Sequence, residues 1–146
     1  MQVISQESCP MPTRCPSGRH DQHNVYAERC PCRALLDLLA NKWSALAIGL
    51  LDERDRMRFS ELQAALPGVG AKMLTKTLRR LEAASLVERT VYAEVPPRVE
   101  YSLTKLGISV NEPLAQIRAW AEDNIDTIDG LNPHWDALDP LTSFEK

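Results

Sequence analysis

The sequence predicts an α+β fold that is mainly helical, and three observations in its middle third support this prediction. Apolar residues recur at helical spacing in two short segments, a Pro-Gly turn separates these segments, and two runs of alternating polarity follow them. The segments are a helix at 60–66, the turn Pro67-Gly68, a helix from Ala71, and strands at 86–92 and 98–103. Helix, turn, helix and a two-stranded hairpin, in this order, form a winged helix-turn-helix.

The two helices have recognisable ends. Ser60 followed by Gln63 fits a capping box, in which two side chains satisfy backbone donors at a helix start. Pro67-Gly68 ends the first helix, because proline lacks an N–H and glycine accepts left-handed dihedrals. One apolar stripe faces the core from the second helix, formed by Leu74, Leu78 and Leu81.

Polar side chains on the opposite side of the second helix predict contact with DNA. We expect Lys72 and Lys76 to contact phosphates, and Thr75 and Arg79 to reach base edges. Outside this helix, two further cations are candidate phosphate contacts: Lys42, and Arg98 at the base of the hairpin loop. The alternative for each is an ordinary solvated charge on a small domain.

Many short motifs in one order resemble those of a known family. They are Cys30-Pro31, Lys42-Trp43, 58–62, 66–68, 72–75, 86–89 and 95–104. Together they resemble HxlR-type bacterial transcriptional regulators over about residues 30–128. The resemblance implies a homodimeric winged-helix repressor or activator that binds double-stranded operator DNA. Members usually carry a serine where this chain has Gly70, so the cap of the recognition helix is weaker here.

The chain has the length of one domain with two extensions. Of its 146 residues, we assign 30–128 to the winged helix-turn-helix domain. Residues 1–29 are polar, contain prolines and lack any period, which predicts a flexible N-terminal extension. Residues 129–146 are expected to be an acidic C-terminal tail, with Trp135 and Leu138 packed on the domain.

Charge is distributed unevenly along the chain. The formal net charge is −3, which by itself argues against a nucleic-acid partner. However, residues 54–105 hold ten Lys and Arg against six Asp and Glu, whereas residues 106–146 hold two against eight. A locally positive surface is what phosphate contact requires, so the distribution remains compatible with DNA binding.

The sequence indicates a cytoplasmic protein without a metal or other cofactor. No apolar run approaches the ~18 residues that span a bilayer, and residues 1–29 lack the order of a secretory signal. We therefore expect no membrane contact and no disulfide framework among the four cysteines. Soft ligands do occur near the N-terminus, but none has the C-x2-C spacing of a zinc knuckle: Cys9, Cys15, His20, His23, Cys30 and Cys32.

Cys30 is the candidate redox sensor. Pro31 suits the first position of a helix, so Cys30 lies at or next to the cap, where Arg29 and Arg33 also favour a thiolate. In HxlR-like regulators, the cysteine of this Cys-Pro motif senses oxidants, quinones or other electrophiles in several members. A cysteine that only packs is the alternative. Cys32 could lie in the core or act as a resolving partner.

The C-terminal part of the domain predicts a dimer interface. We expect Thr104 to cap a helix that runs to about Glu112, and Pro113 to kink or restart it. A long apolar stripe follows at helical spacing. A stripe of this length either covers the core of its own chain or pairs with a second copy. The resemblance implies that it pairs with a second copy, together with the helix beginning at Cys30. The dimerisation residues would be Leu114, Ile117, Trp120, Ala121 and Ile125.

Taken together, these features predict a DNA-binding transcriptional regulator that responds to oxidants or electrophiles through Cys30. A regulator controlled by a small ligand or a partner, without thiol chemistry, remains an alternative. A thiol-disulfide oxidoreductase using Cys30 and Cys32 is disfavoured, because C-x-x-C on a βαβ pattern is absent. No phosphate-binding glycine loop or nucleophile elbow indicates another enzyme.

Overall fold

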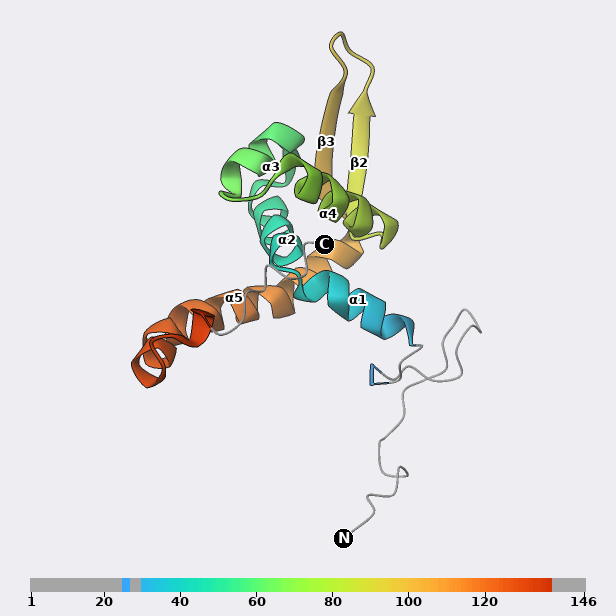
Figure 1. Ribbon diagram of the computed structural model, residues 1–146. Coiled ribbons are helices and arrows are strands. Elements are labelled where there is room, and N and C mark those ends of the chain that lie inside the picture. The colour runs from blue at the N-terminus through green and yellow to red at the C-terminus, as the bar shows by residue number, and fades with distance from the viewer. Residues whose placement is uncertain (1–24, 27–29, 138–146) are drawn as a thin grey trace.

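The computed structural model, which describes residues 25–26 and 30–137, has the predicted order of elements (Figure 1). These elements are α1 (Pro31–Ala40), α2 (Lys42–Arg54), β1 (Arg56–Arg58), α3 (Phe59–Ala65), α4 (Ala71–Ala83), β2 (Val87–Tyr92), β3 (Arg98–Leu103), α5 (Lys105–Leu131) and a 3-10 turn, η2 (Trp135–Ala137). The fold is therefore mainly helical with one small sheet, as predicted. The β2–β3 hairpin projects from the helices as the wing.

The sheet is antiparallel with the strand order β1-β3-β2. Its register places Met57 opposite Tyr101, and Tyr101 opposite Arg89. Residues directly opposite each other share a face of the sheet, and side chains alternate between faces along a strand. Because Met57 and Val87 are buried, the row containing Arg89 and Tyr101 lies on the face that packs on the helices. We call this the helix face and the other the outer face.

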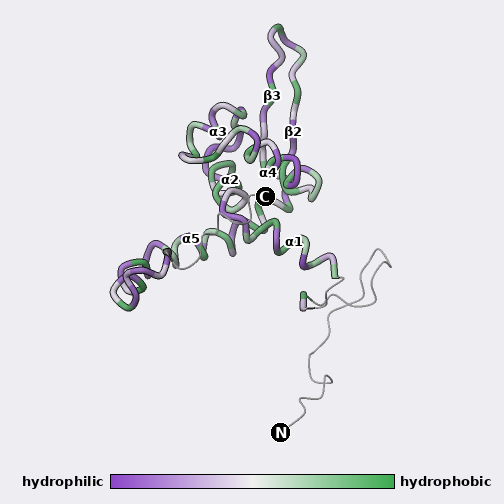
Figure 2. Tube along the Cα trace, viewed as in Figure 1, coloured by the Kyte–Doolittle hydropathy of each residue, from purple (hydrophilic) through white to green (hydrophobic). Residues whose placement is uncertain are grey.

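One hydrophobic core joins all the elements around α2. Its members come from α1 to α5 and from the sheet: Leu38, Trp43, Ala47, Ile48, Leu51, Met57, Leu62, Leu66, Val69, Leu74, Leu78, Leu81, Leu86, Val87 and Leu114. The predicted stripe of α4 is confirmed, since Leu74, Leu78 and Leu81 are at most 1% exposed. Figure 2 shows hydrophobic and hydrophilic residues alternating along α1 and the far part of α5.

Arg118 connects α5 to α2 through a hydrogen bond. Its guanidinium donates to the carbonyl of Ala45 at 2.9 Å and to Oδ1 of Asn111 at 2.8 Å. A Cβ added at Gly49 would lie 2.9 Å from the guanidinium carbon, so the glycine makes room for this contact. The contact fixes the direction in which α5 leaves the winged unit.

Two helix predictions were wrong. The start of α3 is Arg58, not Ser60: the Arg58 N–H donates to Oε2 of Glu61 at 2.7 Å. The helix α5 continues through Pro113 to Leu131 instead of ending near Glu112. Proline removes only one backbone hydrogen bond, and α5 is held by Leu114 in the core and by the Arg118 hydrogen bond to Ala45 of α2.

The predicted domain ends differ slightly from the helical boundaries. The first residues of the expected tail, 129–131, belong to α5. Trp135 donates from Nε1 to Oδ1 of Asp129 at the end of α5, at 2.7 Å, and is 43% exposed, so its packing on the domain stays a prediction. Leu138, the rest of the tail and almost all of the N-terminal extension lie outside the described residues, as do Cys9, Cys15, His20 and His23.

Candidate nucleic-acid interface

The helix α4 carries exposed cations on the side away from its buried stripe. Gly70 is its N-cap, without a capping side chain, as the sequence predicted. Lys72, Lys76 and Arg79 are exposed. Thr75 is partly buried, and its hydroxyl donates to the Ala71 carbonyl at 2.7 Å, which leaves the oxygen able to accept a bond from a base edge.

Lys42 lies at the start of α2. Its ammonium is 4.7 Å from the centre of the Trp43 ring, which holds the side chain at this end of the helix. Asn41 ends α1 and caps α2, because its Oδ1 accepts from the Trp43 N–H at 2.9 Å. Lys42 is exposed, so its ammonium is available to a phosphate.

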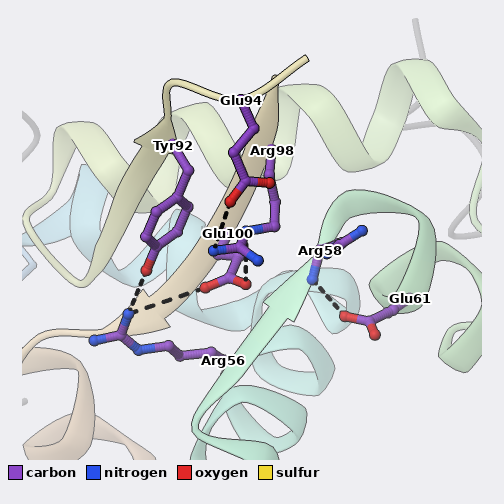
Figure 3. A network of polar contacts seen from close by, with 7 residues as sticks. All are labelled: Arg56, Arg58, Glu61, Tyr92, Glu94, Arg98 and Glu100. Carbon is purple, nitrogen blue, oxygen red and sulfur yellow. Dashed lines mark hydrogen bonds and ion pairs between the residues drawn. The ribbon is translucent and has the colours of Figure 1, made fainter. Parts of the chain in front are cut away.

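Arg98 lies in a polar network on the outer face of the sheet (Figure 3). Its guanidinium is 3.4 Å from a Glu94 oxygen and 3.5 Å from a Glu100 oxygen, and it lies over the Tyr92 ring at 4.1 Å. The side chain is 30% exposed. Arg98 is therefore held by two carboxylates and a ring at the base of the wing.

Arg56 completes the same network from β1. Its Nη1 donates to the Tyr92 hydroxyl at 2.7 Å and is 3.9 Å from Glu100 (Figure 3). All ion pairs between described residues involve Arg56 or Arg98. The cations of α4 therefore have no carboxylate partner in the described part of the chain.

A polar hollow of about 340 Å³ lies between α4 and the helix face of the sheet. Residues from α4, β2 and β3 line it: Thr75, Arg79, Glu82, Arg89 and Tyr101. Sequence reasoning missed Arg89 as a site residue. Its position two residues after the apolar Val87, in an alternating strand, is the signal that places it on the face turned to α4.

The cysteine of the Cys-Pro motif is the N-cap residue of α1, as predicted. Cys30 is buried at 8% exposure, and Cys32 is partly buried. Burial of the residue limits the access of a reagent to Cys30. Burial at this level favours packing in the resting state.

The predicted dimerisation residues divide into two groups. Leu114 is 7% exposed and belongs to the core of its own chain. Ile117, Trp120 and Ile125 are 62%, 60% and 38% exposed, and Ala121 beside them is also exposed. An apolar surface of this kind on a long helix is available to a partner.

A second hollow, of about 330 Å³, lies between α2, α3 and α5. Its walls are largely apolar and include Trp43, Leu50 and Leu66, and Arg118 reaches it from α5. This groove adjoins the contact that fixes the direction of α5.

The described residues contain neither a single membrane-spanning helix nor a cluster of metal-binding side chains. No single helix there is long and apolar enough to cross a membrane; α1 and α2 reach that length and composition only together, and they meet at 73°. No group of three or more His, Cys, Asp or Glu side chains lies close enough to hold a metal ion within the described ranges.

The helix-turn-helix, the wing and the unpaired cations of α4 define a winged helix-turn-helix DNA-binding regulator. Residues 38–129 match the profile of the HxlR-like helix-turn-helix family. The chain belongs to this family. YtfH of Escherichia coli (strain K12), described as an uncharacterized HTH-type transcriptional regulator, is 40% identical over 105 residues, which are 72% of this chain and 82% of YtfH.

Solved structures agree with this assignment. A putative transcriptional regulator, ytfH from Salmonella typhimurium, is similar with a TM-score of 0.73 and 36% identity, over 77% of this chain and 99% of that one. The redox regulator HypR, in its reduced form, is similar with a TM-score of 0.63 and 36% identity, over 68% of this chain and 98% of HypR. The predicted family and fold are confirmed.

Proposed function

We propose that this regulator is a cytoplasmic, non-enzymatic homodimer that binds operator DNA through α4 and responds to oxidants or quinone-like electrophiles through Cys30. The unpaired, exposed cations of α4 carry the DNA-binding part, because counterion release from phosphates requires basic side chains that no carboxylate neutralises. A homodimer supplies two copies of α4, which reach half-sites about one turn of DNA, ~34 Å, apart.

Each sequence-predicted DNA residue has a role in this proposal. Lys42, Lys72 and Lys76 contact phosphates, and Thr75 contacts a base edge. The Arg98 guanidinium lies beside Glu94 and Glu100 in the structure, so Arg98 contacts a phosphate only when one of these ion pairs breaks. Arg79 also contacts the DNA.

The dimer is supported by exposed apolar residues on two helices. On α5 these are Ile117, Trp120, Ala121 and Ile125, and on α1 Leu35 and Leu36 are 44% and 53% exposed. Burial of such side chains against a second copy removes apolar area from water, at about 25 cal/mol per Å². Sedimentation at micromolar concentration should give a dimer, and a monomer alone would contradict this part of the proposal.

Similarity to HypR, a redox regulator solved in reduced and oxidised forms, supports the thiol response. Cys30 is the buried N-cap residue of α1, so an intersubunit disulfide or an electrophile adduct at its sulfur would displace the start of that helix. Because α1 packs on α2, this displacement reaches the winged unit. The separation of the two α4 helices would then change.

Fluorescence anisotropy with the DNA upstream of the regulator's own gene tests the proposal. Reduced protein should bind tightly, and treatment with diamide or a quinone should change the affinity. The change should disappear in Cys30→Ser and persist in Cys32→Ser if Cys32 is a core residue. An affinity that responds to oxidant equally in Cys30→Ser would exclude Cys30 as the sensor.

A regulator controlled by a small ligand is a second candidate, because one observation favours it. The apolar groove between α2, α3 and α5 adjoins the Arg118 contact, so an occupant there would alter the direction of α5. DNA binding that is indifferent to oxidant would retain the regulator and favour this candidate over the thiol response.

A further inference from the structure

Two arginines from different elements meet at the polar hollow beside α4. Arg79 extends from α4, and Arg89 extends from β2 on the helix face of the sheet. Tyr101 is opposite Arg89 in the register and lines the same hollow. Their convergence on one space of about 340 Å³ brings several N–H and O–H donors close together.

The charge of this hollow is not neutralised by ion pairs. Neither Arg79 nor Arg89 has a carboxylate oxygen within 4.0 Å among the described residues, although Glu82 lines the same space. Both arginines are exposed. Two guanidinium groups and one carboxylate leave the hollow with a net positive charge, so an anion fits it better than a cation.

We propose that the hollow binds one backbone phosphate of duplex DNA between Arg79 and Arg89. The phosphate is bracketed by planar guanidinium groups, which match its oxygens with paired N–H donors. When α4 lies in the major groove, its exposed side chains lie near the sugar-phosphate strand that borders the groove, and the hollow lies between α4 and the wing. The inference rests on the proposed function and assigns Arg79 to a phosphate rather than a base edge.

A double-mutant cycle tests whether the two arginines share one phosphate. Arg79→Gln, Arg89→Gln and the double variant would be titrated with a 30-bp random-sequence duplex and with the upstream DNA. Loss of one phosphate contact costs about fivefold in affinity at 0.15 M salt, because the salt slope falls by about 0.9 per phosphate. We expect the double variant to lose about this factor on both duplexes, and each single variant to lose less, because the remaining arginine still contacts the phosphate.

Arg80→Gln is the matched control, because Arg80 is an exposed neighbour on α4 that does not line the hollow. The losses of Arg80→Gln and Arg89→Gln should multiply in their double variant, since they act at separate places. Unchanged melting temperatures would show that all these variants fold. If the affinity losses of Arg79→Gln and Arg89→Gln also multiply in their double variant, the two arginines do not share a phosphate. A loss of affinity in Arg79→Gln that is confined to the upstream DNA would likewise overturn the proposal.

Replacing Glu82 gives an independent test, in which the affinity for DNA should rise instead of fall. Glu82→Gln removes the carboxylate from the hollow and should strengthen binding to both duplexes by about two- to fivefold. Glu88→Gln, on the outer face of β2, should have a smaller effect. Equal effects of the two variants would contradict the assignment. Wild-type protein that binds neither duplex would instead overturn the proposed function itself, so the two failures are distinguishable.

Discussion

The two faces of the wing sheet differ in whether their arginines have carboxylate partners. On the outer face, Arg56 and Arg98 are engaged by Glu94, Glu100 and Tyr92. On the helix face, Arg89 has no carboxylate within 4.0 Å among the described residues. The same residue type therefore stiffens the hairpin on one face and remains available to a ligand on the other. Partners, not residue type, decide which cations are available to DNA.

The largest effect that separates the two faces should come from Arg98→Gln. This change leaves Glu94 without its cation and Glu100 with only Arg56 at 3.9 Å, and it removes the contact with the Tyr92 ring, so it should lower the free energy of unfolding by about 1–2 kcal/mol. Thermal or urea unfolding measures it. Arg89→Gln is the control and should change stability by less than about 0.5 kcal/mol, as for most surface substitutions. Equal losses of stability in Arg98→Gln and Arg89→Gln would show that the carboxylate partners on the outer face do not stabilise the fold.

A smaller effect is expected for Tyr92→Phe. The ring stays over Arg98, but the hydroxyl that accepts from Arg56 at 2.7 Å is lost, which should cost about 0.5–1 kcal/mol of unfolding free energy. In a cycle with Arg56→Gln, the loss should be less than additive, because both changes remove the same bond. Fully additive losses would show that the hydrogen bond contributes nothing to stability.

The smallest effect should come from Glu94→Gln. Glu94 is 53% exposed and its ion pair with Arg98 measures 3.4 Å, so water screens the pair, and its loss should cost at most about 0.5 kcal/mol in urea unfolding. Glu100, at 19% exposure, provides the comparison, and Glu100→Gln should cost more. If Glu94→Gln cost more than Glu100→Gln, exposure would not control the strength of these pairs.

The order of helices and strands was predictable because period and turn residues are local properties. The stripe of α4 and the Pro67-Gly68 turn illustrate this. The N-cap of α3 was misplaced by two residues because arginine has no side-chain acceptor and gives no capping signal in the sequence, so only the contact of the Arg58 N–H with Glu61 reveals it. The uninterrupted helix at Pro113 was missed because packing of α5 on α2 is a tertiary contact, which the local sequence does not reveal.

The candidate site was less predictable than the fold. Lys72, Lys76 and Arg79 follow from the helical period, and the structure shows them exposed. The partners of Arg98 depend on strand register, which the sequence does not specify. The burial of Cys30 likewise depends on tertiary packing. Whether a cation lacks a carboxylate partner, and whether a cysteine is accessible, depends on how the helices and strands pack together. Residue type alone therefore could not predict either property.

Salt-dependent fluorescence anisotropy of the reduced, full-length protein on its own upstream DNA tests the central claim most directly. We expect saturable binding between 50 and 200 mM salt, with a log-log salt slope of several units that becomes shallower in Lys76→Gln and changes less in Arg98→Gln, because Arg98 already lies beside two carboxylates. The absence of binding, or binding with no salt dependence, would contradict a regulator that reaches DNA through the cations of α4.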